Sequence, residues 1–498
     1  MKRDRSPFCN PIRPACIAAF VFATRSSFAE PAPAPVVDDA PGSAELLARL
    51  RERVAQPGGL TSAEAGRRAV LTSPEDRSRK ADVEAAASEI DRADVGYYPK
   101  LTLTARYTRL SAITPPAVGP LLAPVVAPNQ PPPTPGTIVT NGVVGSFAFP
   151  VVLDNYMLQA NVVVPLSDYF LRIGQTREAA VSNEQASAIT REAARRSVAT
   201  QAKLAYYTWA RDRMQEAVTE QSVEQARWHL ELARAGRDAG RTPDVDVVRA
   251  ESSLAGAELL HQRTANAARV AEERLRTLLH DASGAPYRIG EDLLAPLPKP
   301  VVEAPAVLYA EALGKRPEMR AFEKSEASLR AERTATESTG LPRLDAFGNG
   351  YVANPSPRIF PQREEWKATW DVGVQLTWSP NDLGGADAST RSIDAKRRQL
   401  DAERAAVKDA LRDEISAAVV ATEEAVEEAE SADRGLSAAE ESYRVRRELF
   451  ALGRATQVEL VDAETDVLRA RLEMIQARVD GRVARVQLDH AVGRDVSR

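Results

Sequence analysis

Few side chains in this sequence are of the types that carry out chemistry, and none of them is grouped as a catalytic or metal site requires. The histidines lie singly in helical sequence, without a His-x-x-x-His spacing and without a neighbouring cysteine: His229, His261, His280 and His490. The sequence contains no Walker A loop, no nucleophile elbow and no dinucleotide-binding glycine fingerprint. We therefore expect a protein that is not an enzyme and that has neither a cofactor nor a bound metal.

One pair of carboxylates is distinguished by its position. Glu459 and Asp462 follow a turn at Gly453 and are spaced one helical turn apart, which places both acids on the same face of a helix. Two carboxylates placed in this way can attract cations. The plainer interpretation is that both are ordinary solvated residues just past a turn, and their spacing alone does not decide between the two.

The sequence repeats itself, so these residues belong to one of two copies of a larger unit. The motif Tyr98-Pro99-Lys100-Leu101 recurs 243 residues later as Leu341-Pro342-Arg343-Leu344. The turn Gly240-Arg241-Thr242 recurs 213 residues later as Gly453-Arg454-Ala455. The second offset is shorter because a proline-rich insert, from about Pro115 to Pro135, occurs only in the first copy. Each copy predicts a short helix, two strands and a long helical hairpin, with the copies at 60–300 and 301–493.

Composition favours long helices and argues against nucleic acid as a partner. The 498 residues are 44% hydrophobic but only 5% aromatic, which suits helices packed closely through small side chains. The formal net charge is −5 with both signs interspersed, and the sequence has no basic stripe of the kind that binds nucleic acid.

Residues 1–29 resemble a secretory signal peptide. A basic start precedes a short apolar run, and Ser27-Phe28-Ala29 offers a small-x-small cleavage site. A disordered tail or a misassigned start is the alternative. Both cysteines, Cys9 and Cys16, lie in this segment, so the mature chain would have no thiol. A Pro/Ala-rich linker and N-terminal segment is expected over 30–59, and a short tail over 494–498.

Alternating apolar and polar residues predict four strands of about the length that crosses a bilayer. They are expected at about 98–110, 156–165, 343–352 and 369–378. Aromatic residues near the ends of such strands suit the two membrane interfaces, and the candidates are Tyr107, Trp370 and Trp378. The alternative is that these are half-buried strands of a soluble sandwich.

Between the first two strands an outer loop is expected over 111–146. Nine prolines from Pro115 to Pro135 remove too many backbone donors for a strand or a helix. A disordered insert fits this composition equally well. The long helices are predicted at about 168–235, 245–280, 382–451 and 457–490, and heptads of alternating large and small residues pair them as antiparallel coiled-coil hairpins.

Together these features resemble the TolC-like outer membrane efflux protein family from about Leu60 to Gly493. The motifs that carry the resemblance are Leu60-Thr61-x-x-Glu64-Ala65, the two Pro-Lys/Arg-Leu strand openings, Pro165-Leu166-x-Asp168, Asn381-Asp382-Leu383-Gly384-Gly385 and the tip from Gly453 to Ala463. The resemblance implies a mixed α/β, mainly α, membrane protein. It would be a homotrimer with a twelve-stranded outer membrane β-barrel continued by a periplasmic coiled-coil tunnel. The residues alone require an oligomer, because four strands cannot close a barrel, and they allow two copies or three.

By the same resemblance, the chain is expected to be a passive exit duct of a tripartite efflux or type I secretion system. It would lie in the outer membrane with a large periplasmic part. Its partners would be a periplasmic adaptor (membrane fusion) protein, an inner membrane transporter and outer membrane lipid, and its cargo stays open between drugs, metals and proteins. The competing hypothesis is a periplasmic coiled-coil adaptor or scaffold without a pore, against which the four barrel-length strands argue.

The resemblance also assigns a role to the acidic pair. Glu459 and Asp462 match the acids that ring the closed periplasmic entrance in this family. Three copies would bring six carboxylates around a narrow axis and favour cations. Asp246 is the equivalent of Glu459 in the first copy, whereas Arg249 replaces the second acid, so the two halves differ in charge.

The lock and the tips are assigned in the same way. A tyrosine and an arginine that help to close the family's inner hairpin are matched here by Phe450 and Ala455, so a different lock is expected, and Arg454 is a candidate member. The turns Gly240-Arg241-Thr242 and Gly453-Arg454-Ala455 sit where the family meets its adaptor. Glycine in such turns also has the simpler explanation that it permits a left-handed backbone.

Overall fold

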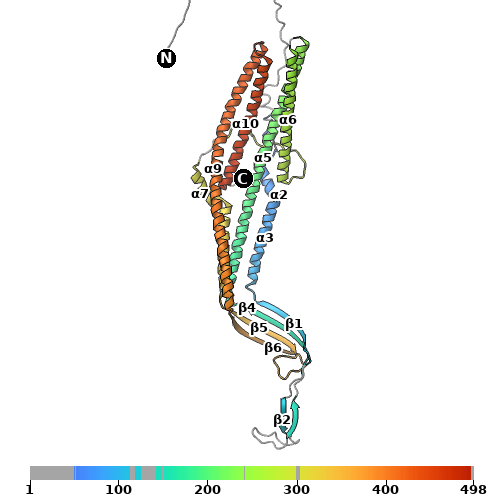
Figure 1. Ribbon diagram of the computed structural model, residues 1–498, viewed down its shortest axis with the longest axis vertical. Coiled ribbons are helices and arrows are strands. Elements are labelled where there is room, and N and C mark those ends of the chain that lie inside the picture. Colours follow the sequence, from blue (N-terminus) through green and yellow to red (C-terminus); the bar gives the residue numbers. More distant parts are fainter. Residues whose placement is uncertain are drawn as a thin grey trace, which may run out of the picture.

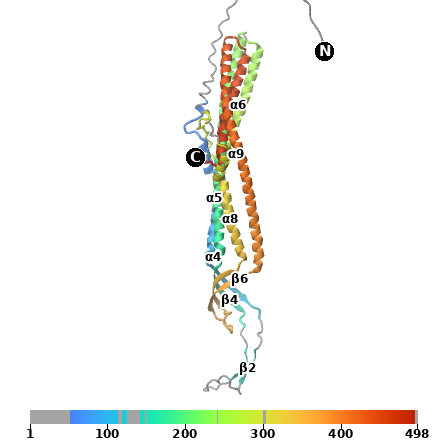
Figure 2. The same ribbon diagram turned by 90° about the vertical axis from the view of Figure 1, so that its left-hand side faces the viewer.

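The computed structural model is an elongated molecule in which a small β-sheet continues a bundle of long helices (Figure 1). It describes residues 50, 52–112, 118–124, 142–147, 151–240, 242–298 and 303–494. The predicted signal segment 1–29 and tail residues 495–498 lie outside the described residues, as does most of the predicted linker. A view turned by 90° shows the same long axis and the sheet at one end of the helices (Figure 2).

The main sheet has four antiparallel strands in the order β1-β4-β5-β6. The strands are β1 (Lys100–Arg109), β4 (Asp154–Val164), β5 (Arg343–Asn354) and β6 (Lys367–Thr377). All three neighbouring pairs keep a continuous register, without a bulge. The two central strands come from different copies of the sequence repeat, so the sheet itself joins the two halves.

Part of the segment 111–146, which the prolines predict to be an extended loop, instead forms a second sheet. The strands β2 (Val118–Pro124) and β3 (Gly142–Phe147) pair as an antiparallel hairpin. A two-stranded hairpin tolerates proline because both of its strands are edges, where a missing N–H need not cost a ladder bond. The segment between these strands, 125–141, lies outside the described residues.

Four long helices make up most of the length. They are α5 (Ile173–Asp238), α6 (Asp244–Leu279), α9 (Pro380–Ala451) and α10 (Gln457–Val492). At 1.5 Å per residue, the 66 residues of α5 and the 72 of α9 span about 100 Å each. The shorter elements are α2 (Ser62–Thr72), α3 (Pro74–Val95), α4 (Asp168–Leu171), α7 (Pro305–Lys315), α8 (Pro317–Glu337) and the 3₁₀ turn η1 (Ser338–Gly340).

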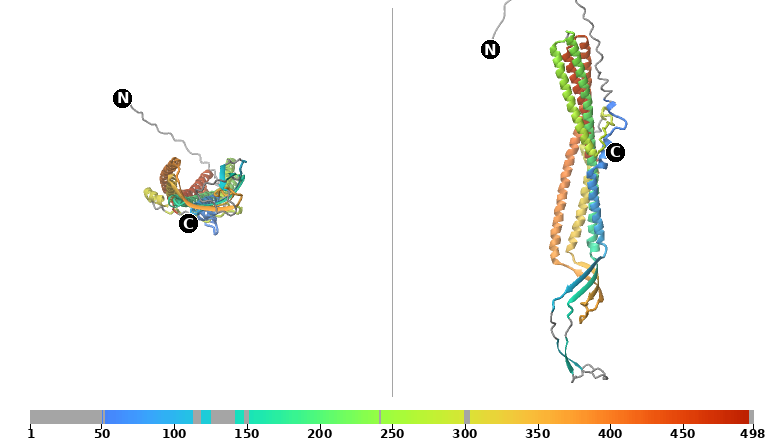
Figure 3. Two further views of the ribbon diagram at one scale, coloured as in Figure 1. Left: turned by 90° about the horizontal axis from the view of Figure 1, so that it is seen from below. Right: turned by 90° about the vertical axis from the view of Figure 1, so that its right-hand side faces the viewer.

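The sequence repeat appears as two equivalent sets of elements. The first set runs α2, α3, β1, β4, α5 and α6, and the second runs α7, α8, β5, β6, α9 and α10. The sets interlock, because α5 packs against α8 and α10 as well as against its own α3 and α6. Seen from below, the elements follow a curve that is open on one side (Figure 3).

The principal hydrophobic core lies where the two sets meet, between α2, α5, α6 and α10. Trp209 and Tyr206 of α5 are fully buried there, with ring centroids 5.8 Å apart, together with Met474 of α10. Much of the remaining core is alanine, which lets helix backbones approach closely. Burying these apolar surfaces is what fixes the hairpins to one another.

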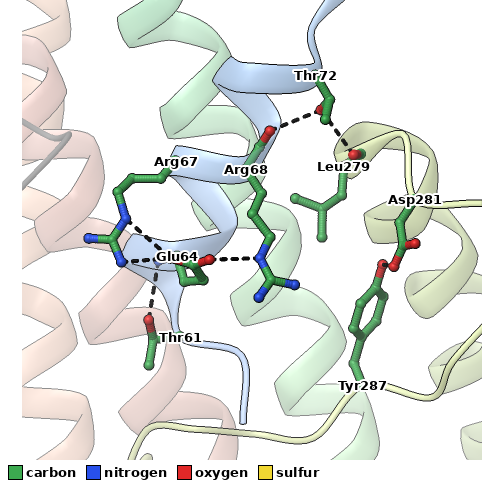
Figure 4. A network of polar contacts seen from close by, with 8 residues as sticks. All are labelled: Thr61, Glu64, Arg67, Arg68, Thr72, Leu279, Asp281 and Tyr287. Atoms are coloured by element: carbon green, nitrogen blue, oxygen red, sulfur yellow. Dashed lines mark hydrogen bonds and ion pairs between the residues drawn. The ribbon is translucent and has the colours of Figure 1, made fainter. Parts of the chain in front are cut away.

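A polar network fastens α2 to the end of α6 beside this core (Figure 4). Thr61 caps α2 by accepting from the Glu64 N–H at 3.2 Å. The hydroxyl of Thr72, at the other end of α2, donates to Leu279 O at 2.9 Å. Just beyond α6, the Tyr287 hydroxyl donates to Asp281 at 2.7 Å, and this bond helps to hold the pKa of Asp281 at about 2. The Thr72–Leu279 bond therefore joins the C-terminal end of α2 to the end of α6, while Thr61 caps the N-terminal end of α2.

Candidate functional site

Each long hairpin turns back at a glycine at the end of the molecule opposite the main sheet (Figure 1). Gly240 and Gly453 have φ values of +72° and +68°, a backbone region that L side chains rarely adopt. At the second turn, the Arg454 N–H donates to Leu449 O at 2.8 Å and the Gly453 N–H to Phe450 O at 2.9 Å. This is a Schellman helix end, which satisfies carbonyls that would otherwise lack partners.

The first turn depends on a second glycine that sequence reasoning missed. The Thr242 N–H donates to Gly236 O at 3.2 Å, which folds the turn onto the last turn of α5. A Cβ atom at Gly236 would overlap the Thr242 hydroxyl. Arg241, the central residue of the predicted contact turn, lies outside the described residues. Of the first turn, the described members are Gly240 and Thr242.

Glu459 forms part of the N-terminal cap of α10. Its carboxylate accepts from the Thr456 N–H at 2.8 Å and from the Thr456 hydroxyl at 3.0 Å, while the Glu459 N–H donates to Thr456 Oγ1 at 3.3 Å. This is a complete capping box. The bonds from Thr456, backbone first, lower the pKa of Glu459, so this exposed carboxylate is ionised at neutral pH.

The structure brings Asp246 and Asp462 together in one groove near the tips. The groove has a volume of about 70 Å³. Arg249 Nη1 lies 3.3 Å from Asp246 Oδ1, so the acid from α6 is paired with a base on its own helix. Glu459 does not line this groove. The lining residues are His229, Asp246, Arg249, Ala250, Ser253, Gln457, Val458, Val461 and Asp462.

Phe450, which the resemblance places at the lock, packs inside the second hairpin. It lies against a buried cluster formed by Tyr443, Leu460, Ala463 and Val467, so it joins α9 to α10. Arg454 is exposed at the turn and Ala455 is half-buried. The Phe450 side chain therefore stabilises the hairpin that carries the acids.

A buried polar cluster lies where α5 passes α9 and α10. His229 Nε2 of α5 is 2.6 Å from Glu464 Oε2 of α10, and the two side chains are 6% and 12% exposed. Tyr443 of α9 is hydrogen-bonded to the same carboxylate, and burial together with Glu464 raises the pKa of its phenol, which therefore stays protonated. We call His229, Tyr443, Glu464, Arg471 and Gln221 the seam cluster.

The other two members of the seam cluster are equally buried. Arg471 Nη2 lies 3.2 Å from Glu440 Oε1, and burial lowers the pKa of Arg471 from its ordinary value. Gln221 is 3% exposed, and among the described residues neither its amide oxygen nor its amide nitrogen has a hydrogen-bond partner. Polar groups in such a place are costly unless they are fully paired, which makes the cluster a weak point in the packing.

The heptad pattern of α10 contains a sequence signal for two members of the seam cluster. Glu464 and Arg471 each follow a core alanine of α10, Ala463 and Ala470, and are seven residues apart. Charged residues recurring beside a heptad core mark a flank that contacts a neighbouring helix. The partner on α5, His229, could not be identified without knowing which helices meet.

One face of the main sheet is apolar from edge to edge. The register aligns Leu101, Val162, Gly348 and Val372 in one row and Leu103, Ala160, Gly350 and Trp370 in the next. On β6 the apolar side chains stay largely exposed: Trp370 75%, Val372 72%, Val374 70% and Leu376 68%. An exposed apolar surface of this extent marks contact with a membrane or another protein.

The opposite face of the sheet is polar and tied by side-chain hydrogen bonds. Asn161 donates to Asn349 at 2.5 Å, and Asn349 donates to Asp371 at 2.8 Å, so one ladder crosses β4, β5 and β6. Arg358, from the loop after β5, pairs with Asp371 and lies over the Tyr351 ring at 4.8 Å. The sheet thus has one face suited to lipid and one suited to water.

Aromatic residues lie toward both ends of this sheet. Near the end of β1, the Tyr107 ring lies 5.1 Å from Tyr156, which in turn lies 6.0 Å from Trp366. At the end that joins the helices, Trp378 Nε1 donates to Gly340 O at 3.2 Å. Tyr107 and Trp378 are each more than half exposed, so their rings stay available for an outside contact.

The histidines are dispersed. His261 faces Thr219 at 3.4 Å, His490 faces Thr200 at 3.2 Å, and His280 adopts a left-handed backbone at the end of α6. Within the described part of the chain, no three His, Cys, Asp or Glu side chains are grouped to hold a metal. Among those same residues, no helix has the length and apolar character needed to cross a membrane.

This chain is similar in sequence to outer membrane efflux proteins. A family profile described as "Outer membrane efflux protein" matches residues 67–280 and 308–494. The "Probable efflux pump outer membrane protein TtgC" and the "Antibiotic efflux pump outer membrane protein ArpC", both of Pseudomonas putida, are 23% identical over 329 residues. The aligned region covers 64% of this chain and 64% of each relative, a little under two thirds of their length.

Solved structures share the fold over most of the chain. The outer-membrane channel OprN superposes with a TM-score of 0.67 at 19% identity, over 88% of this chain and 91% of that one. The CmeC channel of Campylobacter jejuni gives 0.68 at 15% identity, over 88% and 86%. The MtrE channel of Neisseria gonorrhoeae gives 0.67 at 16% identity, over 87% and 90%.

Proposed function

Because this chain belongs to the outer membrane efflux protein family, we propose that it is a passive exit duct that carries cargo from an inner membrane pump across the periplasm and outer membrane. The observation that carries this proposal is the main sheet, whose apolar face crosses all four strands and leads directly into helices about 100 Å long. The apolar face would lie in outer membrane lipid, and the helices would line the periplasmic part of the duct.

The sheet edges support a closed assembly of several copies, for which we propose three. In the described residues β1 and β6 each pair on one side only, and an open edge in lipid would leave backbone groups without partners. Because all four strands alternate in direction, β6 of one copy would run antiparallel to β1 of the next. Three copies would give a twelve-stranded barrel, which belongs to the proposal along with the homotrimer.

The helical end of the molecule would meet the other components. We place a periplasmic adaptor at the turns around Gly240 and Gly453, and an inner membrane transporter beyond it. These turns are exposed, compact and farthest from the sheet (Figure 1). The relatives are named as efflux pump proteins, and this favours efflux over type I secretion. Antibiotic-like organic compounds are the cargo class we propose from the name of ArpC.

The entrance would be gated by Glu459 and Asp462. Both side chains are exposed near the tip, and three copies would contribute six carboxylates around the axis. The capping bonds keep Glu459 ionised, so the ring would hold negative charge at neutral pH and favour cations. Asp246, paired with Arg249, would add little net charge to this ring.

The alternative of a pore-free periplasmic adaptor or scaffold would account for the hairpins alone. It leaves the apolar sheet face without a purpose, because a soluble scaffold would expose that face to water. We therefore favour the duct.

The duct is tested by single-channel recording of the purified protein in a planar bilayer. Small cation-selective steps are expected, and their preference for cations should fall in the double variant Glu459→Gln/Asp462→Asn. The double variant Glu251→Gln/Glu258→Gln removes two exposed carboxylates from α6 and is the matched control. Absence of any conductance from folded, inserted protein would contradict the duct. An unchanged preference in the tip variant would remove only the gate assignment.

A further inference from the structure

The loop between β5 and β6, residues 355–366, folds back over the polar face of the main sheet. It leaves the sheet at the end remote from the helices (Figure 1). Arg358 lies four residues beyond the end of β5 at Asn354, yet its Nη1 donates to Trp370 O at 3.2 Å. Trp370 is the fourth residue of β6, so the guanidinium reaches about 10 Å back along that strand from its start.

Three contacts hold Arg358 in this position. Besides the carbonyl of Trp370, its guanidinium contacts the Asp371 carboxylate and lies over the Tyr351 ring at 4.8 Å. Tyr351 and Asp371 belong to neighbouring strands, and the register places both side chains on the polar face. Ser356, close to the start of the loop, is buried. We call Arg358, Asp371 and Tyr351 the loop clamp.

The loop ends on the opposite face of the sheet. The ring centroid of Trp366, the last loop residue, lies 6.0 Å from that of Tyr156. Tyr156 lies directly opposite Tyr107 and belongs to the apolar face. The loop therefore crosses the rim of the sheet from the polar to the apolar side, and contacts on both faces fix its course.

We infer that this loop forms a second constriction, in the opening of the duct remote from the helices, and that the loop clamp holds it there. The inference rests on the proposed duct function, in which the polar face lines the pore, and it adds a limit on cargo size at the exit. Chain packed face to face on a sheet lies about 10 Å from it, and threefold symmetry would place three such loops at one height around the axis. Arg358 is a positioning residue, because it acts by keeping the loop in the pore.

The constriction would present apolar side chains to passing cargo. Ile359 and Phe360 follow Arg358 directly, and they are 38% and 76% exposed. An apolar ring in a pore disfavours water and hydrated ions, and it admits apolar molecules more readily. The exit would therefore suit organic compounds better than metal ions.

The strength of the loop clamp suits a constriction that yields to cargo. The Arg358 and Asp371 side chains are 39% and 34% exposed, and ion pairs that stay this open to water add little stability. Asp371 also accepts from Asn349 at 2.8 Å, which keeps its carboxylate in place when Arg358 moves away. The sheet can thus stay intact while the loop moves, so release of the loop should widen only the exit.

The test measures the width of each opening with neutral polyethylene glycols of graded mass, added to one side of the purified full-length protein in a planar bilayer. A glycol that enters the pore lowers its conductance, so the heaviest glycol that does so reports the width of that opening. Arg358→Ala should admit severalfold heavier glycols from the sheet side and should leave the limit from the helical side unchanged. The matched control is Arg363→Ala, which removes an exposed arginine from the same loop and should behave as wild type.

Two further variants separate positioning of the loop from a general loss of structure. The charge swap Arg358→Glu/Asp371→Arg re-forms an ion pair and should return the limit on the sheet side towards the wild-type value. The double variant Arg358→Cys/Asp371→Cys should show a raised limit, which a short thiol crosslinker should lower and cleavage of the linker should raise again. The crosslinker is specific because the only natural cysteines, Cys9 and Cys16, lie in the predicted signal segment.

The outcomes distinguish the constriction from the duct. An unchanged limit on the sheet side in Arg358→Ala, or an equal rise on both sides, would overturn the constriction while leaving the duct intact. A raised limit that neither the charge swap nor crosslinking lowers would overturn the role of the loop clamp. Absence of conductance in wild type and in every variant would instead contradict the duct itself.

Discussion

Replacing Val374 by arginine tests which face of the main sheet meets lipid. Val374 lies midway between Trp370 and Trp378, points to the apolar face and is 70% exposed in the single chain. At about 3.3 Å per residue, the eight residue steps from Trp370 to Trp378 span about 26 Å, close to the height of a membrane-facing apolar band. Val374 therefore lies near the bilayer midplane if the sheet crosses the outer membrane.

The size of the effect follows from that position. An arginine on the lipid face costs about 2–4 kcal/mol at the midplane. With three copies in the proposed trimer, the total is about 6–12 kcal/mol, comparable with the whole stability of a folded domain. We expect Val374→Arg to reach the outer membrane poorly and to unfold at clearly lower urea concentration in lipid vesicles.

The matched control is the adjacent residue. Gln375 points to the polar face and pairs in register with Asp345, so an arginine there stays in water and gains an acidic neighbour. Gln375→Arg should insert and unfold like wild type. Equal behaviour of the two variants, or greater damage from Gln375→Arg, would refute the assignment of the faces and the barrel with it.

Three further predictions concern the tips and the region where the two repeats meet. Glu459→Gln should keep the capping box and lose the charge, whereas Glu459→Ala should lose both. Deuterium exchange of the backbone amides in the first turn of α10 should therefore rise severalfold only in the alanine variant. Equal exchange in the two variants would show that Glu459 does not cap the helix. Gly236→Ala should disturb the first turn and speed proteolysis there, because its Cβ would overlap Thr242. The control Gly435→Ala, in an open helical position, should instead stabilise the folded protein by about 0.5–1 kcal/mol. Equal rates of proteolysis in the two variants would contradict a special role for Gly236. Arg494 and Lys315 hold the pKa of Glu311 at about 2, below its ordinary 4.5, so the stabilisation it provides is present above pH 4.5 and is lost as pH falls towards 2. The difference in melting temperature between wild type and Glu311→Gln should accordingly shrink over that range, and a constant difference would exclude this ion pair as its cause.

The sequence predicted the long elements better than the places where they meet. Period-two alternation in β6 and heptads in α10 are strong local signals, because one side of each element faces a uniform environment. In β5 the apolar face is made by Ala346, Gly348 and Gly350, whose small side chains give no hydrophobic signal of their own. Only pairing with β4 and β6 reveals that this face continues that of its neighbours.

In the candidate site, too, local features were easier to predict than contacts between distant helices. The tip glycines and the Thr456–Glu459 cap could be predicted from a few adjacent residues. The meeting of Asp246 with Asp462, and of His229 with Glu464, joins residues more than two hundred positions apart and depends on how α5, α6 and α10 cross. The hairpin of β2 and β3 was missed because counting prolines ignores that a two-stranded ribbon has only edges.

The unbroken length of α9 gives it the mechanics of a lever. Its middle is held by the buried cluster around Ile415 and Val419, and about 36 residues, or about 54 Å, extend from there to the tip at Ala451. A stiff rod of that length that tilts by about 5° carries its end sideways by about 5 Å. An aperture at the tips could therefore widen by several ångströms while the sheet at the other end stays still. Small changes in the tilt of this helix, rather than refolding, would be enough to open or close such an aperture.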